Sequence, residues 1–351
     1  MRDVLPEISR WRERGERIAV ATVVDVKKSA PRAPGAKMAV SASGEIAGGV
    51  SGGCVEGAVV EIAEQVMAGA APQLVHFGIP DSDAWDVGLP CGGEIDVWVQ
   101  AYEPTRFEEI ARAGGRAAEV TMLEGPQLGA KLLIDADGGR WGSLGSPELD
   151  DEAARIADEL LWSDTSERRG PLFVDVTAPA PRLILFGAVD IAAHLCTLAR
   201  DCEWRPYVVD PRARFATPDR FPDAEEVIAA WPEEAFARLG GIDPATSIVV
   251  LTHDPKLDDA ALTIALRSPA RFVGAMGSRR AQAARRERLL AAGMSEEELD
   301  RLSAPVGLDL GAVAREETAL SILAEVIAAR HGRDGGRLAA RGSGRIHQVP
   351  A

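Results

Sequence analysis

The sequence predicts an α/β protein with an N-terminal α+β domain followed by a Rossmann-like domain built on a parallel sheet. Its 351 residues correspond to about two domains at roughly 150 residues each. After residue 181, runs of β-branched and apolar residues alternate with helical patterns, which is typical of βαβ units. A segment rich in proline and alanine at 178–181 separates this half from the first. We therefore expect domains at 1–170 and 181–332, followed by a disordered tail at 333–351.

In the first domain, strand-like and helix-like segments alternate irregularly. The β-branched run at 18–26 predicts a strand, and Val55, Val59, Ile62 and Val66 have the spacing of one helix face. In chain order we expect a helix at 5–14, a strand at 18–26, a loop at 29–35, a hairpin of 37–41 and 45–50, a helix at 54–68, strands at 73–77 and 94–101, further strands within 116–146, and a helix at 148–162.

In the second domain the alternation is regular, as a parallel sheet with helices on both faces requires. We expect strands at 183–187, 206–210, 226–230, 247–252 and 271–275, and helices at 191–200, 256–267, 278–292 and 315–330.

Composition excludes several classes of protein. The 39 basic and 54 acidic residues give a net charge of −15, which argues against a nucleic-acid binder. The longest apolar runs are far too short to span a bilayer, and the first residues lack the features of a signal peptide. We therefore expect a cytoplasmic protein with no membrane span. The four cysteines include no C-x-x-C pair, so a structural zinc site is not expected, and Cys196 and Cys202 are interpreted as core-packing residues or as cysteines without a role.

The first motif follows the strand at 183–187. Gly187 and Ala192 occupy the first and third positions of a dinucleotide-binding turn, and Asp210 ends the next strand, where a ribose ligand would lie. Val189 stands at the second glycine position, where its side chain would obstruct a pyrophosphate, and Asp190 adds a negative charge. Dinucleotide binding and a Rossmann scaffold retained for another ligand are the two interpretations. We prefer the second, and we expect NAD(P) to bind poorly.

A second motif is the glycine-rich segment 48–57 at the start of a predicted helix. It contributes Gly49, Ser51, Gly52, Gly53, Cys54 and Glu56. Free backbone N–H groups in such a loop suit an anion, and the helix dipole stabilises a thiolate at this position. We expect the loop to hold a phosphate-bearing ligand with a soft metal or sulfur centre near Cys54. The alternative is a tight turn with a buried cysteine.

A third motif, 88–94, places Cys91 and Gly92 at the start of a strand. If the two loops meet, Cys54 and Cys91 face one pocket, and such thiolates suit molybdenum, copper or sulfur transfer. An isolated loop thiol is the alternative.

Two further motifs follow predicted parallel strands, where ligands collect in open α/β sheets. His253 and Asp254 follow one strand, and Gly277, Ser278, Arg279 and Arg280 follow the next. His253 and Asp254 could act as acid–base or phosphate-binding groups, and a helix cap with a surface histidine is the alternative. The glycine, serine and arginine motif could bind a phosphate, and a solvated helix face is the alternative. Asp309 lies in a loop that returns to this edge, and Arg285 and Arg286, further along the helix, are expected to dock a partner.

Together these motifs resemble the XdhC/CoxI family of accessory proteins for xanthine dehydrogenase and carbon monoxide dehydrogenase. The resemblance covers nearly the whole chain, with its longest matches at 47–56, 89–93, 250–259, 273–280 and 305–312. It implies an N-terminal α+β domain and a C-terminal Rossmann-like domain.

The resemblance also implies a function. Members of the family bind molybdenum cofactor, protect it during sulfuration by a cysteine desulfurase, and pass it to a client apoenzyme. Cys54 and Cys91 would then approach the molybdenum, while glycine N–H groups and Arg279 or Arg280 would hold the phosphate. This favours a cofactor-insertion chaperone over a catalyst, and no catalytic residue is expected. An NAD(P)-dependent oxidoreductase and a regulatory nucleotide-binding module are the alternatives, and a homodimer stays open.

Overall fold

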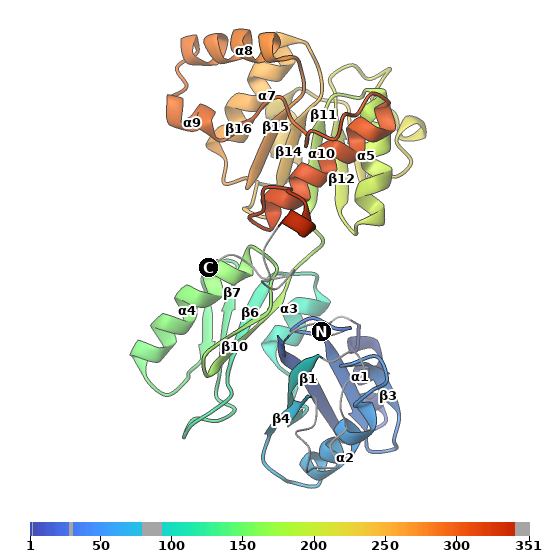
Figure 1. Ribbon diagram of the computed structural model, residues 1–351, viewed down its shortest axis with the longest axis vertical. Helices are drawn as coiled ribbons and strands as arrows, with labels where there is room; N and C mark the ends of the chain where they lie inside the picture. The colour runs from blue at the N-terminus through green and yellow to red at the C-terminus, as the bar shows by residue number, and fades with distance from the viewer. Residues whose placement is uncertain (2, 28–30, 79–92, 341–351) are drawn as a thin grey trace. The chain divides into compact units, whose positions relative to one another are not determined.

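The computed structural model describes residues 1, 3–27, 31–78 and 93–340. The chain divides into two compact units, Met1–Pro179 and Ala180–Ala351, called here the first and second units. The predicted α/β class is confirmed, with antiparallel sheets in the first unit and a parallel sheet in the second (Figure 1). The first unit extends beyond the expected boundary at 170 because its second sheet includes residues 172–177.

The first sheet of the first unit has the strand order β3-β2-β1-β5-β4, and all its neighbouring strands are antiparallel. The strands are β1 (Ile18–Lys27), β2 (Lys37–Ser41), β3 (Ile46–Gly48), β4 (Gln73–Phe77) and β5 (Glu94–Ala101). Helix α2 (Glu56–Met67) packs its apolar side on one face of this sheet. Helix α1 (Leu5–Glu13) covers part of the opposite face through Ile8 and Trp11.

The second sheet has the order β8-β7-β6-β10-β9, again antiparallel. Its strands are β6 (Ala117–Met122), β7 (Lys131–Asp135), β8 (Arg140–Gly142), β9 (Glu167–Arg169) and β10 (Leu172–Thr177). Helix α4 (Pro147–Leu161) packs on one face and α3 (Arg106–Arg112) contributes Phe107 to the other.

The two sheets of this unit are joined by apolar and ionic contacts. Trp98 of β5 packs in one cluster with Leu123 and with Phe173 of β10. Beside them, Lys37 of β2 lies 2.5 Å from Asp175 of β10. The second sheet therefore packs on the part of the α1-side face of the first sheet that α1 leaves uncovered.

The second unit is a six-stranded parallel sheet with helices on both faces (Figure 1). The strands are β11 (Arg182–Phe186), β12 (Arg205–Val209), β13 (Glu226–Ile228), β14 (Ser247–Val250), β15 (Phe272–Ala275) and β16 (Leu302–Ser303). Their order, β13-β12-β11-β14-β15-β16, is the Rossmann order, and it reverses direction between β11 and β14. All five pairings are parallel.

Two apolar clusters hold the helices on this sheet. One joins α5 (Asp190–Asp201) and α10 (Arg315–Arg330) to one face of the sheet. The other joins α6 (Pro232–Arg238), α7 (Pro255–Arg267), α8 (Arg279–Ala291) and α9 (Glu296–Asp300) to the other face. Pro218–Arg220 and Leu338–Ala340 form single 3-10 turns. Because all strands run the same way, the loops after β11, β12, β14 and β15 gather at one edge.

The sequence pattern did not predict α3, α6, α9, β9, β10 or β16. The three helices and β10 have a local signal. Thr105 and Ser295 cap α3 and α9, and Ser295 with Glu298 forms a capping box. Trp231 precedes the proline that starts α6. β10 alternates apolar residues with Asp175, but it adjoins the segment whose composition marks the domain boundary.

Within the described part of the chain, no helix combines the length and the apolar character that crossing a bilayer requires. The last 11 residues of the expected tail, 341–351, lie outside the described residues.

Arg285 is buried, so the expectation that it docks a partner is wrong. Only 3% of the residue is exposed, and its guanidinium donates to Asp258 Oδ2 at 2.7 Å and to the Met276 carbonyl. Asp258 in turn accepts a hydrogen bond from Thr252. This network connects α7 and α8 to the ends of β14 and β15. Arg286 is partly exposed and pairs with Glu296 and Asp300 of α9.

Breaking this buried pair from one side should destabilise the second unit. Arg285→Leu leaves Asp258 charged and buried without its partner, which costs about 3–5 kcal/mol of unfolding free energy. The double variant Asp258→Leu with Arg285→Leu should lose less, because no charge is left alone. Chemical denaturation of the three proteins measures the difference. Equal stability of Arg285→Leu and wild type would contradict the structural role.

Candidate functional site

A cleft of about 480 Å³ opens at the carboxyl edge of the parallel sheet in the second unit. It lies where the strand order reverses, between the loops that follow β11 and β14. Its walls comprise Val189, Asp190, Ile191, Arg212, Leu251, Thr252, His253, Asp254, Met276 and Arg315. This is the position at which open α/β sheets bind ligands.

Asp210, the expected ribose ligand, does not face this cleft. It is fully buried, and its carboxylate accepts hydrogen bonds from Ala188 N at 2.9 Å and from the Arg212 backbone and guanidinium at 2.7–2.9 Å. Burial raises the pKa of Asp210, but the hydrogen bonds from Arg212 and Ala188 outweigh it, so the pKa is lowered. Asp210 therefore orients Arg212, and Arg212 is the side chain that lines the cleft.

The expected repulsion of a phosphate by Asp190 is also offset. Asp190 lies 2.6 Å from Arg315 and 3.4 Å from Arg220, so two guanidinium groups flank one carboxylate at the start of α5. The two arginines thus neutralise the carboxylate of Asp190. The expected steric obstruction by Val189 still holds, because Val189 occupies the N-cap position of α5 and lines the cleft.

Gly187 is required by packing. It has φ +122°, and a Cβ there would come within 2.5 Å of Thr252 Cγ2. The turn after β11 thus passes directly against the end of β14, which brings Val189 and His253 to the same cleft.

The remaining expected residues of the second unit lie at the same sheet edge. Asp254 caps α7 by accepting a hydrogen bond from Lys256 N at 3.0 Å, and Ser278 caps α8 through Ala281 N at 3.2 Å. Within the described residues Arg279 and Arg280 are exposed and make no ion pair. Gly277 has φ +138° at the turn before them. Asp309 is exposed in the loop before α10.

In the first unit, the glycine-rich loop closes around a carboxylate of its own chain. Glu56 Oε1 accepts N–H from Val50, Ser51 and Gly52 at 2.8–3.2 Å. Oε2 accepts from Gly53 N, Val55 N and Ser51 Oγ at 2.5–3.2 Å. Burial would raise the pKa of Glu56, but the hydrogen bonds from Ser51 and the backbone lower it to about 2. The loop forms an anion-binding nest, and Glu56 occupies it.

The expected phosphate cradle at Gly49, Gly52 and Gly53 stays a prediction, and it requires displacement of Glu56. Cys54 is half-buried at the base of the loop, with its N–H donated to Ser51 Oγ at 3.0 Å. Cys91 and Gly92 lie outside the described residues. Among the residues that are described, no three His, Cys, Asp or Glu side chains form a group that could hold a metal ion.

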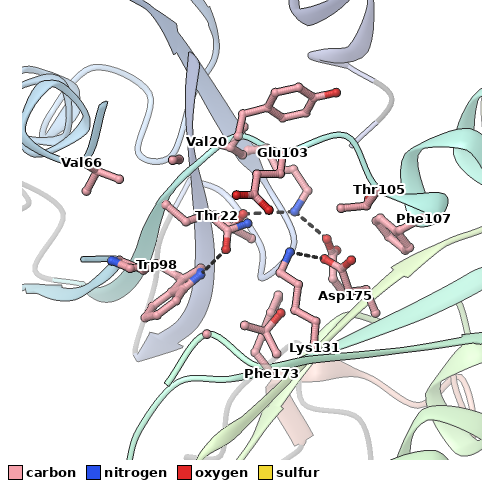
Figure 2. A pocket seen from close by; sticks show the side chains of 18 of the residues that line it. Val20, Thr22, Val66, Trp98, Glu103, Thr105, Phe107, Lys131, Phe173 and Asp175 are labelled. Atoms are coloured by element: carbon pink, nitrogen blue, oxygen red, sulfur yellow. Dashed lines mark hydrogen bonds and ion pairs between the residues drawn. The ribbon is translucent and has the colours of Figure 1, made fainter. Parts of the chain in front are cut away.

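A second cavity, of about 390 Å³, lies in the first unit along the contact of its two sheets. Figure 2 shows Thr22, Lys131, Glu103 and Asp175 directed into the same space, with Trp98 and Phe173 beside it. The Lys37–Asp175 pair is 6% and 10% exposed at its side chains, and the Lys131–Glu119 pair, at 2.7 Å, is 28% and 12% exposed.

Most of the charged residues in the two cavities were not predicted from the sequence. A signal was available in the first unit, where Lys37 and Asp175 stand inside otherwise apolar strand patterns. Arg212 follows β12 and Arg315 starts α10. These positions indicate a place in the cleft only once the order of the strands in the sheet is known.

Replacing Glu56 with Gln should loosen the glycine-rich loop. The amide keeps one acceptor oxygen, but its NH2 group faces backbone N–H donors. We expect this to lower the free energy of unfolding by about 1–3 kcal/mol. Because the folded pKa of Glu56 is depressed, its stabilisation is present above pH 4.5 and is lost as the pH falls toward about 2. Stability measured across this window should therefore fall more steeply for wild type than for Glu56→Gln. Parallel curves would show that Glu56 does not hold the loop.

Comparison with known proteins gives matches over both units. A model described as the XdhC Rossmann domain matches residues 183–326, and one described as the XdhC and CoxI family matches residues 11–78. A Bacillus subtilis protein named as a probable subunit of xanthine dehydrogenase is 29% identical over 90% of this chain and 94% of its own length. The molybdenum cofactor insertion chaperone PaoD of Escherichia coli is 27% identical over 90% of this chain and 84% of its own.

A solved structure supports the same relationship. The crystal structure of a protein described as a xanthine dehydrogenase from Bacillus halodurans superposes with a TM-score of 0.64 at 27% identity, covering 96% of this chain and 97% of that one. The predicted resemblance is confirmed: with its two parts matched by the two models of one family, the chain belongs to the XdhC and CoxI family.

Proposed function

We propose that this protein is a carrier and insertion chaperone for molybdenum cofactor. It would bind the cofactor, protect it during sulfuration by a cysteine desulfurase, and deliver it to a client enzyme of the xanthine dehydrogenase or carbon monoxide dehydrogenase type. The similarity to a protein named as such a chaperone supports the cargo. A cytoplasmic location and a homodimer stay predictions.

The observation that carries the proposal is the cleft at the carboxyl edge of the second unit. Arg212 is held rigidly by the buried Asp210, so its guanidinium is oriented before a ligand arrives. Arg315 pairs with Asp190, but both side chains are more than half exposed, so the pair is weak and can exchange for a phosphate. A guanidinium suits bidentate phosphate binding.

We assign the cofactor's phosphate to Arg212, Arg315 and the start of α5, with Arg279 and Arg280 as further cations at the same sheet edge. His253 lines the cleft beside them. Cys54 or Cys91 of the first unit is a separate candidate contact for the molybdenum or its terminal sulfur, because a thiolate is a suitable ligand for a soft metal. The chain's part in this chemistry is to hold, orient and release the cargo.

An NAD(P)-dependent oxidoreductase fits the same cleft less well. A ribose would need the carboxylate of Asp210, and both its oxygens are already bonded to Ala188 and Arg212. Val189 also stands where a pyrophosphate would approach the helix. These two contacts favour a ligand that is not a dinucleotide.

The carrier function predicts bound molybdenum and pterin after purification from a host that makes the cofactor. Arg212→Met should lower both by at least tenfold, because it removes an oriented guanidinium. Arg238→Gln is the matched control, since Arg238 pairs with Glu226 at the opposite edge of the same sheet. Metal analysis and pterin fluorescence provide the measurement. Bound NAD(P) with turnover, and no pterin, would favour the oxidoreductase.

Cys54→Ala separates binding from transfer. We expect the variant to fold and to retain pterin, but to protect the sulfurated cofactor less well, so that client activation falls severalfold. Cys202→Ala is the control, because Cys202 is an exposed thiol in the second unit. Unchanged client activation by Cys54→Ala would restrict this cysteine to packing against α2.

A further inference from the structure

The cavity of the first unit contains an arrangement of charges that packing does not require. Asp175 of β10 and Glu119 of β6 are direct partners in the antiparallel register, so two carboxylates lie side by side on one face. Like charges opposite one another destabilise a sheet. Each carboxylate is neutralised by a lysine: Asp175 by Lys37 of the first sheet and Glu119 by Lys131 of β7.

The two ion pairs differ in how many hydrogen-bonding groups they leave free for a ligand. Lys37 is buried and already donates to Thr22 Oγ1 at 3.1 Å as well as to Asp175. Lys131 donates to Glu119 Oε1, while Glu119 Oε2 has no hydrogen-bond partner among the described residues. Thr121, the register partner of Lys131, lines the cavity too. The Lys131–Glu119 pair is therefore the one that can bind a ligand.

The lining restricts the charge of that ligand. Two lysines and the N-terminal ammonium of Met1 lie among the lining residues with three carboxylates, those of Glu103, Glu119 and Asp175, so the cavity carries no excess of positive charge. An anion such as phosphate is disfavoured. The volume of about 390 Å³ lies in the range of about 300–1,000 Å³ typical of small-ligand pockets, and Trp98 and Phe107 supply apolar wall. An uncharged planar heterocycle fits these properties.

We propose that this cavity binds the 2-amino-4-oxopyrimidine edge shared by pterins and guanine. That edge presents two N–H donors, from the amino group and the ring nitrogen, followed by an oxygen acceptor. The Glu119 carboxylate accepts from the two donors, and Lys131, 2.7 Å from the same carboxylate, donates to the oxygen. The buried Lys37–Asp175 pair keeps the neighbouring acidic position neutral.

The assignment to a pterin, as distinct from guanine, rests on the proposed function, because molybdenum cofactor contains a pterin. The recognition of the shared edge rests on the cavity alone. Binding of free compounds to the full chain is independent of whether the purified protein contains molybdenum.

The experiment titrates cofactor-free full-length protein with pterin, lumazine and guanosine, using calorimetry. Lumazine matches pterin except that an oxygen replaces the 2-amino group. That oxygen is an acceptor, so it cannot donate to the Glu119 carboxylate. Pterin should bind at least tenfold more tightly than lumazine. Glu119→Gln should abolish that preference, and Lys131→Met should weaken pterin binding at least fivefold. Glu61→Gln, an exposed change on α2, is the matched control and should bind as wild type.

Near-ultraviolet circular dichroism first verifies that each variant is folded. Equal affinities for pterin and lumazine, or undiminished pterin binding by Glu119→Gln, would overturn the proposal. Guanosine binding as tightly as pterin would support recognition of the shared edge alone. Binding of pterin but not of guanosine would show that the cavity also recognises the second ring of pterin. Guanosine binding without pterin binding would overturn the pterin assignment.

Discussion

Backbone N–H groups in loops need acceptors, and in this protein carboxylates of the same chain supply them. Glu56 accepts five N–H groups of the glycine-rich loop. Asp210 accepts the N–H of Ala188 in the turn after β11. Glu325 of α10 accepts from Gly307, which shapes the loop before α10. In these three loops a carboxylate of the same chain holds the backbone, and Cys54, Val189 and Asp309 lie in or beside them.

The same principle explains part of the acidic balance of the chain. A net charge of −15 suggests a uniformly acidic surface, yet several of the carboxylates involved are buried or directed inward. Their removal from the surface leaves exposed arginines at the carboxyl edge of the parallel sheet, where Arg212 and Arg315 line a cleft. A strongly acidic protein can in this way present a local site for an anion.

Local pattern was sufficient to predict most elements of the second unit. β-branched runs alternating with helices lead to one topology, because parallel strands with helical crossovers leave few alternatives. The first unit was predicted less completely. The pairing of antiparallel strands into two sheets depends on contacts such as Lys37 with Asp175, which are separated by 138 residues and have no local signature. For the same reason β10, which falls largely between the two expected domains, was not predicted.

The candidate residues show a similar division. Motifs indicated which loops lie at the sheet edge, because their positions after strands are local facts. They did not reveal which polar groups are already in use. Asp210 has the position of a ribose ligand, but only the structure shows Arg212 bonded to both its oxygens. Asp190 looks repulsive in sequence, but Arg220 and Arg315 come from segments 30 and 125 residues away.

The self-occupied nest around Glu56 has a consequence for selectivity. A tethered carboxylate competes with any external anion at an effective concentration that is in the millimolar range or higher for short tethers. Abundant small ions, which offer a single weak contact, are therefore outcompeted without a gate or a lid. A larger ligand that adds contacts elsewhere on the molecule can still displace the side chain, and when it departs the tethered carboxylate is at hand to accept the same N–H groups again.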